Sequence, residues 1–281
     1  MSRSSPTPLA GRTAVITGAA SGIGRSLALR LARHGCPVAL VDVDGTALEE
    51  TATQLGGRSL TRTLDVRDAQ AVGELAAEVA AWAPAPLGAV FNNAGIALAA
   101  PTVDGRREDA ERVMAINFGG VVNGVRAFLP ILLEQGDGAI VNTSSVFGLL
   151  GVPNQSAYCA SKFAVRGYTE SLRHELSGTG VRAILLHPGG VKTNILRNAH
   201  VAHSVDDGRS LEELAAEFEQ RARTTPERAA QLIHEGVDAG RERILIGRDA
   251  RFVDLLARLA PAHSVSVLER LARLGQAAGR H

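Results

Sequence analysis

The sequence predicts an α/β domain with a doubly wound parallel sheet that carries helices on both faces. Short apolar runs alternate with amphipathic segments of helical period through most of the chain, which is typical of successive βαβ units. A glycine-rich turn joins the first apolar run to the first helical segment. No linker-like stretch interrupts the alternation, so we expect one domain over residues 9–247 and an extension over residues 248–281.

The elements follow in order along the chain. Each predicted strand is a short run of apolar or β-branched residues: 13–17, 37–42, 59–64, 88–92, 139–143, 181–187 and 243–247. Each predicted helix has apolar residues at helical spacing: from the glycine turn to about residue 35, then 44–55, 68–82, 108–135, 155–178 and 226–240.

Composition excludes several function classes. Lys plus Arg number 30 and Asp plus Glu 29, a balance that gives no reason to expect a nucleic-acid partner. The 2 cysteines, Cys36 and Cys159, form no CxxC pair, so we expect neither a disulfide framework nor a metal site. No apolar stretch of signal-peptide or membrane-spanning length is evident, and a cytoplasmic location is expected.

The first turn carries a cofactor signal. Its glycines, Gly18, Gly22 and Gly24, follow a G-x-x-x-G-x-G pattern directly after the first predicted strand. Glycine permits a tight turn, lets the backbone approach a pyrophosphate at the helix N-terminus, and allows close packing of helix on strand. An ordinary turn could also contain three glycines, but their position directly after the first predicted strand favours a cofactor-binding turn. We therefore expect a Rossmann-type sheet in which the turn binds a dinucleotide through Thr17, Gly18, Ser21, Gly22, Ile23 and Gly24.

Asp42 ends the second predicted strand. A carboxylate at this place can accept hydrogen bonds from the adenosine ribose hydroxyls and repels a 2′-phosphate. The alternative is an ordinary surface aspartate at a strand end. No Arg or Lys accompanies it in the glycine turn, so the sequence favours NAD over NADP.

Ser145, Tyr158 and Lys162 form the candidate catalytic set. Tyr158 and Lys162 are four residues apart, so they lie one turn apart on the same face of a helix. We expect the lysine ammonium to lower the pKa of the phenol from about 10 toward neutrality. Ser145 can hold a substrate oxygen against the phenol. Taken singly, each could be a structural residue: a strand-end hydroxyl, a core aromatic or a solvated charge.

With these motifs in this order, the chain resembles the main, single-domain branch of the short-chain dehydrogenase/reductase family. The TGxxxGxG turn, the NNAG motif at 92–95, the YxxxK pair and the PGxxxT segment at 188–193 carry the resemblance. It implies a proton-relay role for Asn117, which would act beside Ser145, Tyr158 and Lys162. It also implies further cofactor contacts, from Asp65 and Val66 at the adenine, from Asn92, Ala94 and Gly95, from Tyr158 and Lys162, and from Pro188, Gly189, Val191 and Thr193 at the nicotinamide.

The expected function is hydride transfer between a nicotinamide cofactor and an alcohol or carbonyl substrate. A catalytically silent dinucleotide-binding regulator is the alternative. Apolar residues near the reacting carbon favour a hydrophobic small molecule, with substrate contacts expected from Ser145, Phe147, Tyr158, Ile195 and Leu196. The resemblance also implies a homodimer or homotetramer, to which an apolar face of Phe118, Val121, Val122, Val125 and Phe128 could contribute.

The extension has two predicted amphipathic helices separated by Pro261. The first carries Phe252, Leu255, Leu256 and Leu259 at helical spacing, and the second carries Val267, Leu268, Leu271 and Leu274. Arginines are interleaved in both. Three covers for these apolar stripes remain open: the parent subunit beside the substrate loop, a partner subunit, and a membrane surface. Packing on protein is favoured over membrane contact.

Overall fold

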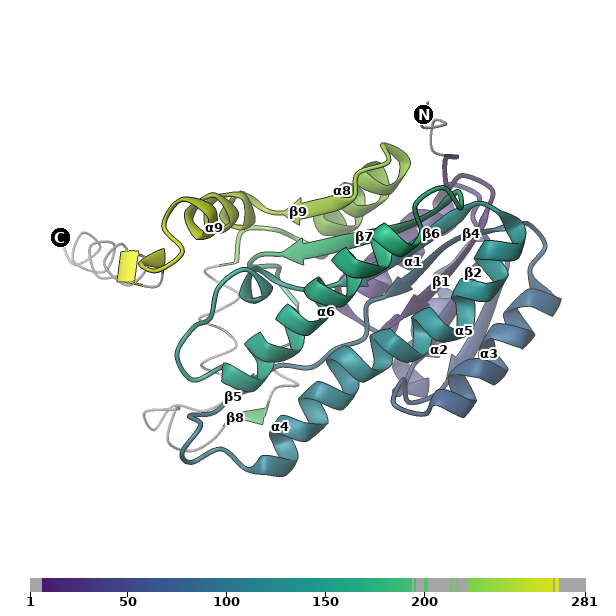
Figure 1. The fold of residues 1–281 in the computed structure, drawn as a ribbon. Coiled ribbons are helices and arrows are strands. Elements are labelled where there is room, and N and C mark those ends of the chain that lie inside the picture. Colours follow the sequence, from purple (N-terminus) through teal and green to yellow (C-terminus); the bar gives the residue numbers. More distant parts are fainter. Residues whose placement is uncertain are drawn as a thin grey trace.

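The computed structural model describes residues 7–193, 195, 200–201, 213, 216, 222–264 and 266–267. Within them, one sheet has the strand order β3-β2-β1-β4-β6-β7-β9, with every neighbouring pair parallel (Figure 1). The order runs outward in both directions from the β1–β4 pair, which is the topological switch point of a doubly wound sheet. The predicted fold class is therefore confirmed.

The strands of this sheet have bounds close to those predicted. They are β1 (Thr13–Thr17), β2 (Val38–Asp42), β3 (Ser59–Thr63), β4 (Leu87–Asn92), β6 (Gly138–Thr143), β7 (Val181–Pro188) and β9 (Arg243–Ile246). The helices are α1 (Gly22–Arg33), α2 (Gly45–Thr53), α3 (Ala69–Trp82), α4 (Arg107–Met114), α5 (Gly120–Gln135), α6 (Ser156–Glu175), α8 (Pro226–Asp238) and α9 (Arg248–Leu259).

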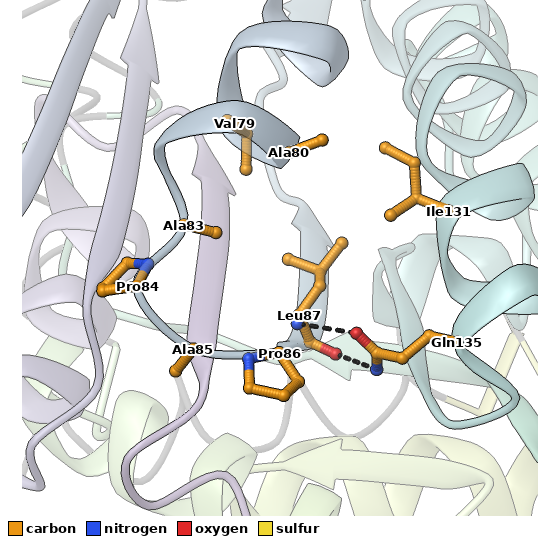
Figure 2. Close-up of a pocket in the computed structure, with 9 residues that line it drawn as sticks. All are labelled: Val79, Ala80, Ala83, Pro84, Ala85, Pro86, Leu87, Ile131 and Gln135. Atoms are coloured by element: carbon orange, nitrogen blue, oxygen red, sulfur yellow. Dashed lines mark hydrogen bonds between the residues drawn. The ribbon is translucent and has the colours of Figure 1, made fainter.

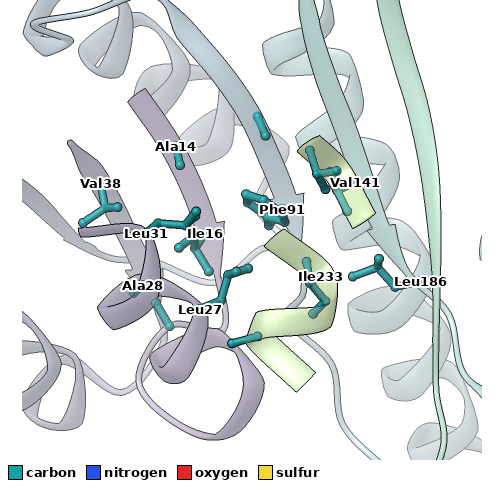
Figure 3. Packing of buried hydrophobic residues seen from close by; sticks show 14 of the residues in the cluster. Ala14, Ile16, Leu27, Ala28, Leu31, Val38, Phe91, Val141, Leu186 and Ile233 are labelled. Atoms are coloured by element: carbon teal, nitrogen blue, oxygen red, sulfur yellow. The ribbon is translucent and has the colours of Figure 1, made fainter. Parts of the chain in front are cut away.

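The core lies on both faces of the sheet because strand side chains alternate between them. In β1, Ile16 belongs to the cluster under α1 and α8, whereas Val15 belongs to the cluster under α3, α5 and α6. Figure 3 shows the first cluster, where Leu27 of α1 and Ile233 of α8 face each other over the strands and Leu31 lies beside Ile16. Because these strands are buried on both faces, their sequences are nearly continuously apolar.

One long predicted helix, 108–135, is interrupted by a π-helical turn, η1 (Ala115–Gly119), that joins α4 to α5. By length and composition the run from Arg107 to Gln135 could cross a membrane, which we did not predict. Its residues Val121, Val125 and Phe128 are buried against the sheet, as in a core helix. They are therefore not free to supply the predicted face between subunits.

Three further short elements were not predicted. Strands β5 (Leu98–Ala99) and β8 (His200–Val201) form a separate parallel pair, and a 3₁₀ turn, η2 (Val146–Gly148), follows Ser145. These elements are too short to produce a periodic pattern. Of the extension, α9 confirms the first predicted helix, whereas most of the second lies outside the described residues.

Candidate active site

A cleft of about 710 Å³ opens at the carboxyl ends of the strands, beside the β1–β4 switch point. Ligands bind at this place in open α/β sheets. The lining combines the glycine turn, the residues after β4 and β6, the start of α6 and the segment after β7. It includes Gly18, Ser21, Gly22, Ile23, Asp42, Asp65, Val66, Ala94, Gly95, Ser145, Phe147, Tyr158, Lys162, Pro188, Gly189, Val191, Thr193 and Ile195.

Two positions of the glycine turn leave no room for a side chain. Gly18 has φ +69°, and a Cβ there would lie 2.9 Å from the Cα of Ala94. At Gly24 a Cβ would overlap the carbonyl oxygen of Gly18, so this glycine serves helix–turn packing. The hydroxyl of Thr17 accepts hydrogen bonds from the N–H groups of Asn93 and Ala94, each at 3.0 Å, which ties the turn to the residues after β4.

The N-terminus of α1 suits an anion. Ser21 makes no side-chain capping bond, and the first turn of the helix holds no acidic residue. The Ser21 side chain therefore leaves the first N–H groups of α1 uncapped, and a pyrophosphate bound beside Ser21 and Gly22 in the cleft would accept hydrogen bonds from them. This arrangement fits a dinucleotide.

Asp42 and Asp65 line the cleft at the carboxyl ends of β2 and β3. The Asp42 carboxylate accepts hydrogen bonds from Ala20 N at 2.9 Å and Asp44 N at 3.1 Å, so it also anchors the glycine turn. Each oxygen keeps a second lone pair for a ribose hydroxyl. Asp65 is paired with Arg67, whose guanidinium holds the pKa of that carboxyl below its usual value.

Tyr158 and Lys162 lie on α6 and are both buried. Burial raises the pKa of Tyr158 to about 12, opposed by a hydrogen bond with Ser145. Burial lowers the pKa of Lys162 to about 8. The predicted lowering of the phenol pKa by Lys162 is therefore not found, because desolvation dominates both groups although Nζ is only 5.7 Å from the ring centre.

Lys162 and Asn117 meet behind the cleft at Gly95. A Cβ on Gly95 would lie 3.0 Å from Asn117 Oδ1 and 3.3 Å from Lys162 Nζ. The Asn117 side chain is fully buried and bonds the backbone of Ile96 and the hydroxyl of Ser161. It comes from the π-helical turn η1, an irregularity that is frequent at functional sites.

The part of the cleft beside Tyr158 is apolar. Phe147 packs edge-on against the Tyr158 ring, with centroids 6.3 Å apart. Ile96, Val146 and Ile195 also line this part. Leu196, which we predicted here, lies outside the described residues.

Several predicted site residues do not line the cleft. The Asn92 side chain is 2% exposed and donates to Asn142 Oδ1 at 2.8 Å, inside the core, whereas its neighbour Asn93 lines the cleft. Thr17, Gly24 and Asn117 lie behind the surface and support it.

Other cleft residues were missed. Asn93, Arg67 and Gly190 adjoin motif residues and could have been found by extending the motifs by one position. Val43, Leu64, Ile116 and Ser144 likewise adjoin predicted site residues, whereas Arg112, Gln155, Ala222, Asp249 and Val253 reach the cleft only through tertiary folding.

His187 is a buried hydrogen-bonding residue near the end of β7. Its Nδ1 lies 2.9 Å from the carbonyl oxygen of Ser145, so that nitrogen carries the proton and donates it. Burial lowers the pKa of His187 to about 4, which keeps the ring neutral.

A second hollow, of about 370 Å³, lies between α3 and α5 (Figure 2). Its lining is mainly small apolar residues and prolines, and Gln135 is fixed there by two hydrogen bonds to the backbone of Leu87. It offers no acid, base or nucleophile, so the first cleft is the candidate active site.

Known proteins resemble this chain over most of its length. The family model for short chain dehydrogenase matches residues 12–203. Putative oxidoreductase SadH of Mycobacterium tuberculosis (strain ATCC 25618 / H37Rv) is 46% identical over 255 residues, which cover 89% of this chain and 91% of SadH.

The names of a second relative and of a solved structure include the cofactor NAD. The 2-dehydro-3-deoxy-L-rhamnonate dehydrogenase (NAD(+)) of Sphingomonas sp. (strain SKA58) is 41% identical over 188 residues, 66% of this chain and 75% of that protein. A crystal structure of a short chain dehydrogenase/reductase from Burkholderia phymatum in complex with NAD has a TM-score of 0.79 at 33% identity, covering 90% of this chain and 94% of that one.

Proposed function

Because the chain belongs to the short-chain dehydrogenase family, we propose that it is an NAD-dependent oxidoreductase that interconverts an alcohol and a carbonyl compound. One observation carries the proposal: Ser145, Tyr158 and Lys162 converge in a cleft that begins at an uncapped helix N-terminus behind a glycine turn. When bound, the nicotinamide supplies or accepts the hydride. The residues of the chain then have to position it and move one proton.

Tyr158 is the proton donor and acceptor at the substrate oxygen. With a pKa of about 12, the phenol is protonated at neutral pH, which is the form that a general acid needs for carbonyl reduction. Ser145, already hydrogen-bonded to Tyr158, orients the substrate oxygen toward the phenol. In alcohol oxidation the same phenol has to lose its proton first.

Lys162 supplies a route for that proton. Its pKa of about 8 lets it exchange a proton with its surroundings close to neutral pH. Its Nζ donates to the carbonyl oxygen of Thr143 at 3.1 Å, which fixes it behind Tyr158. Asn117, whose Oδ1 lies beside Lys162 Nζ next to Gly95, links Lys162 to solvent through a water molecule.

Cofactor preference follows from charge. Asp42 ends β2 inside the cleft and repels a 2′-phosphate, so NAD is used in preference to NADP. The NAD(+) dehydrogenase of Sphingomonas and the Burkholderia structure in complex with NAD support this direction.

The substrate is a hydrophobic alcohol, ketone or aldehyde. Phe147, Ile96, Val146 and Ile195 surround the place where the reacting carbon meets Tyr158 and Ser145. The protein acts in the cytoplasm as a homodimer or homotetramer. Its interface includes the exposed apolar side chains that α5 and α6 keep outside the core, Leu133 (41% exposed) and Phe163 (40% exposed).

A silent dinucleotide-binding regulator of the same fold is the second candidate. It requires the same glycine turn but no acid or base. Purified protein mixed with NAD and a panel of primary and secondary alcohols distinguishes the two. An enzyme raises the absorbance of NADH with at least one alcohol; a regulator binds NADH, as a fluorescence titration detects, and raises it with none.

A further inference from the structure

Helix α9 lies beyond the last strand, at the carboxyl ends of β7 and β9 (Figure 1). It packs against β9 and against η2, the turn that follows Ser145. Two of its residues, Asp249 and Val253, line the same cleft as Tyr158 and Ser145. The segment that the sequence separates from the catalytic domain therefore forms part of the candidate active site.

Asp249 contacts the segment that follows β7. Its Oδ2 accepts a hydrogen bond from the N–H of Gly190 at 2.5 Å. A Cβ on Gly189 would overlap this carboxylate, so the absence of a side chain at 189 is what lets Asp249 approach. The carboxylate thus fixes the backbone immediately after Pro188.

The other side of this segment is held by backbone bonds. Val191 forms a bridge with Thr224, Lys192 N donates to Thr224 O at 2.9 Å, and Thr224 N donates to Gly190 O at 3.3 Å. Gly190 is therefore held by the residues before α8 through its carbonyl and by α9 through its N–H. Loss of Asp249 would release one of these two restraints.

Val253 lies one turn after Asp249 and shares its face of α9. Its side chain is half-buried and enters the cleft, whereas the adjacent Phe252 is 47% exposed and is not part of the cleft lining. Val253 therefore faces the cleft, whereas its neighbour Phe252 lies outside it. This gives a matched pair for testing which face of the helix matters.

We propose that α9 is the substrate-side wall of the active site, in which Asp249 is a positioning residue for the Pro188–Gly190 segment and Val253 limits the size of the substrate. The inference rests on the proposed function. The start of the extension thus has a role in specificity. Helix α9 affects cofactor binding through Gly190 and substrate choice through Val253.

The size test compares Val253→Ala, Val253→Phe and Phe252→Ala in alcohol oxidation with a small and a bulky secondary alcohol. Val253→Phe should lower kcat/KM for the bulky alcohol by about tenfold relative to the small one, the scale expected for one or two methylenes in an apolar pocket. Val253→Ala should shift the ratio the other way. Phe252→Ala should leave the ratio unchanged.

The positioning test measures NADH affinity by fluorescence titration, which needs no turnover. Asp249→Ala should weaken NADH binding by about tenfold, since a hydrogen bond to a charged group is lost. Asp249→Asn keeps an acceptor oxygen and should restore most of the affinity. The far-ultraviolet circular dichroism of each variant should match the wild type, which separates this loss from unfolding.

If the wild type turns over alcohols but the Val253 variants keep the wild-type size ratio and Asp249→Ala binds NADH normally, the inference about α9 is wrong and the proposed function stands. If the wild type oxidises no alcohol, the proposed function fails. In that case the NADH titration still decides the role of Asp249.

Discussion

On α6, the ammonium of Lys162 lies 5.7 Å from the centre of the Tyr158 ring, one helical turn away. Both side chains are buried, at 3% and 7% exposed. Burial lowers the pKa of Lys162 to about 8 and raises that of Tyr158 to about 12. Stability and catalysis therefore depend on pH through this pair.

Lys162→Met should stabilise the fold at neutral pH. A buried lysine whose pKa falls from 10.5 to about 8 carries a penalty on the order of 3 kcal/mol in its charged form. Loss of the hydrogen bond to Thr143 O offsets about 1 kcal/mol of the gain. The net gain should appear as a rise in Tm of a few degrees at pH 7, measured by thermal unfolding.

The pH dependence of that gain follows from the direction of the shift. Between pH 8 and 10.5 the unfolded chain binds more protons at Lys162 than the folded chain, so wild-type stability rises with pH relative to the variant. The difference in Tm should be largest at or below pH 8 and should narrow by pH 9.5. A difference that stays constant from pH 7 to 9.5 would show that the charge of Lys162 is not its cause.

The pH profile of alcohol oxidation should report the same group. Proton loss from Tyr158 is assisted once Lys162 can accept a proton, so kcat/KM should rise from pH 6 and level off above about pH 8. Lys162→Arg keeps a cation that does not deprotonate and should remove this inflection. The same inflection in both proteins would assign it to another group.

The strands, helices and glycine turn follow from local pattern, and so they could be predicted. Val15 and Ile16 read as strand residues because both faces of a central strand are buried. The motif residues could also be placed together in one cleft, since they follow parallel strands whose carboxyl ends meet at one edge of the sheet. Helix α9 was predicted as a helix from its spacing alone.

What could not be predicted depends on three-dimensional environment. The direction of the Tyr158 pKa shift was wrong because the depth of burial is invisible in the spacing of two residues. Asn92 was taken for a cofactor residue because a motif does not say which of two asparagines turns into the core. The contact of Asp249 with Gly190 joins residues far apart in sequence and has no local signal.

The orientation of α9 also differs from its sequence stripe. Ala250 is buried and Val253 is half-buried, whereas Phe252, Leu255 and Leu259 are exposed at 47%, 56% and 75%. Helical spacing identifies an apolar stripe but does not say which surface covers it. The helix therefore reaches the cleft with residues beside the stripe.

Asp42→Asn should weaken the preference for NAD. The wild type should favour NAD over NADP by at least about tenfold in kcat/KM, because a like-charge contact with a 2′-phosphate is unfavourable by about 1.4 kcal/mol or more. The variant removes the charge and keeps an acceptor for Ala20 N. Steady-state kinetics with both cofactors give the ratio.

Asp44→Asn is the matched control for this ratio. Asp44 caps α2 by accepting from Ala47 N, a role that Asn performs equally well. Its ratio should equal that of the wild type. If wild-type protein uses NAD and NADP equally, Asp42 does not face the ribose.

Phe163→Glu should dissociate the oligomer. Phe163 is 40% exposed on α6, and a charge in an apolar interface costs several times more than on a free surface. Light scattering at micromolar concentration should give a dimer or tetramer mass for the wild type and a smaller mass for the variant. A monomer mass for the wild type would exclude the proposed assembly.

In the proposed reaction, Tyr158 exchanges the proton with the substrate oxygen. The most direct measurement is the rate of NADH formation by Tyr158→Phe with the alcohol that the wild type oxidises fastest, together with a fluorescence titration of NADH. The account predicts a loss in kcat of about 100-fold or more, since a positioned acid–base group contributes about 10²–10⁴-fold, with NADH affinity retained. A variant that keeps more than about a tenth of the wild-type kcat would contradict it.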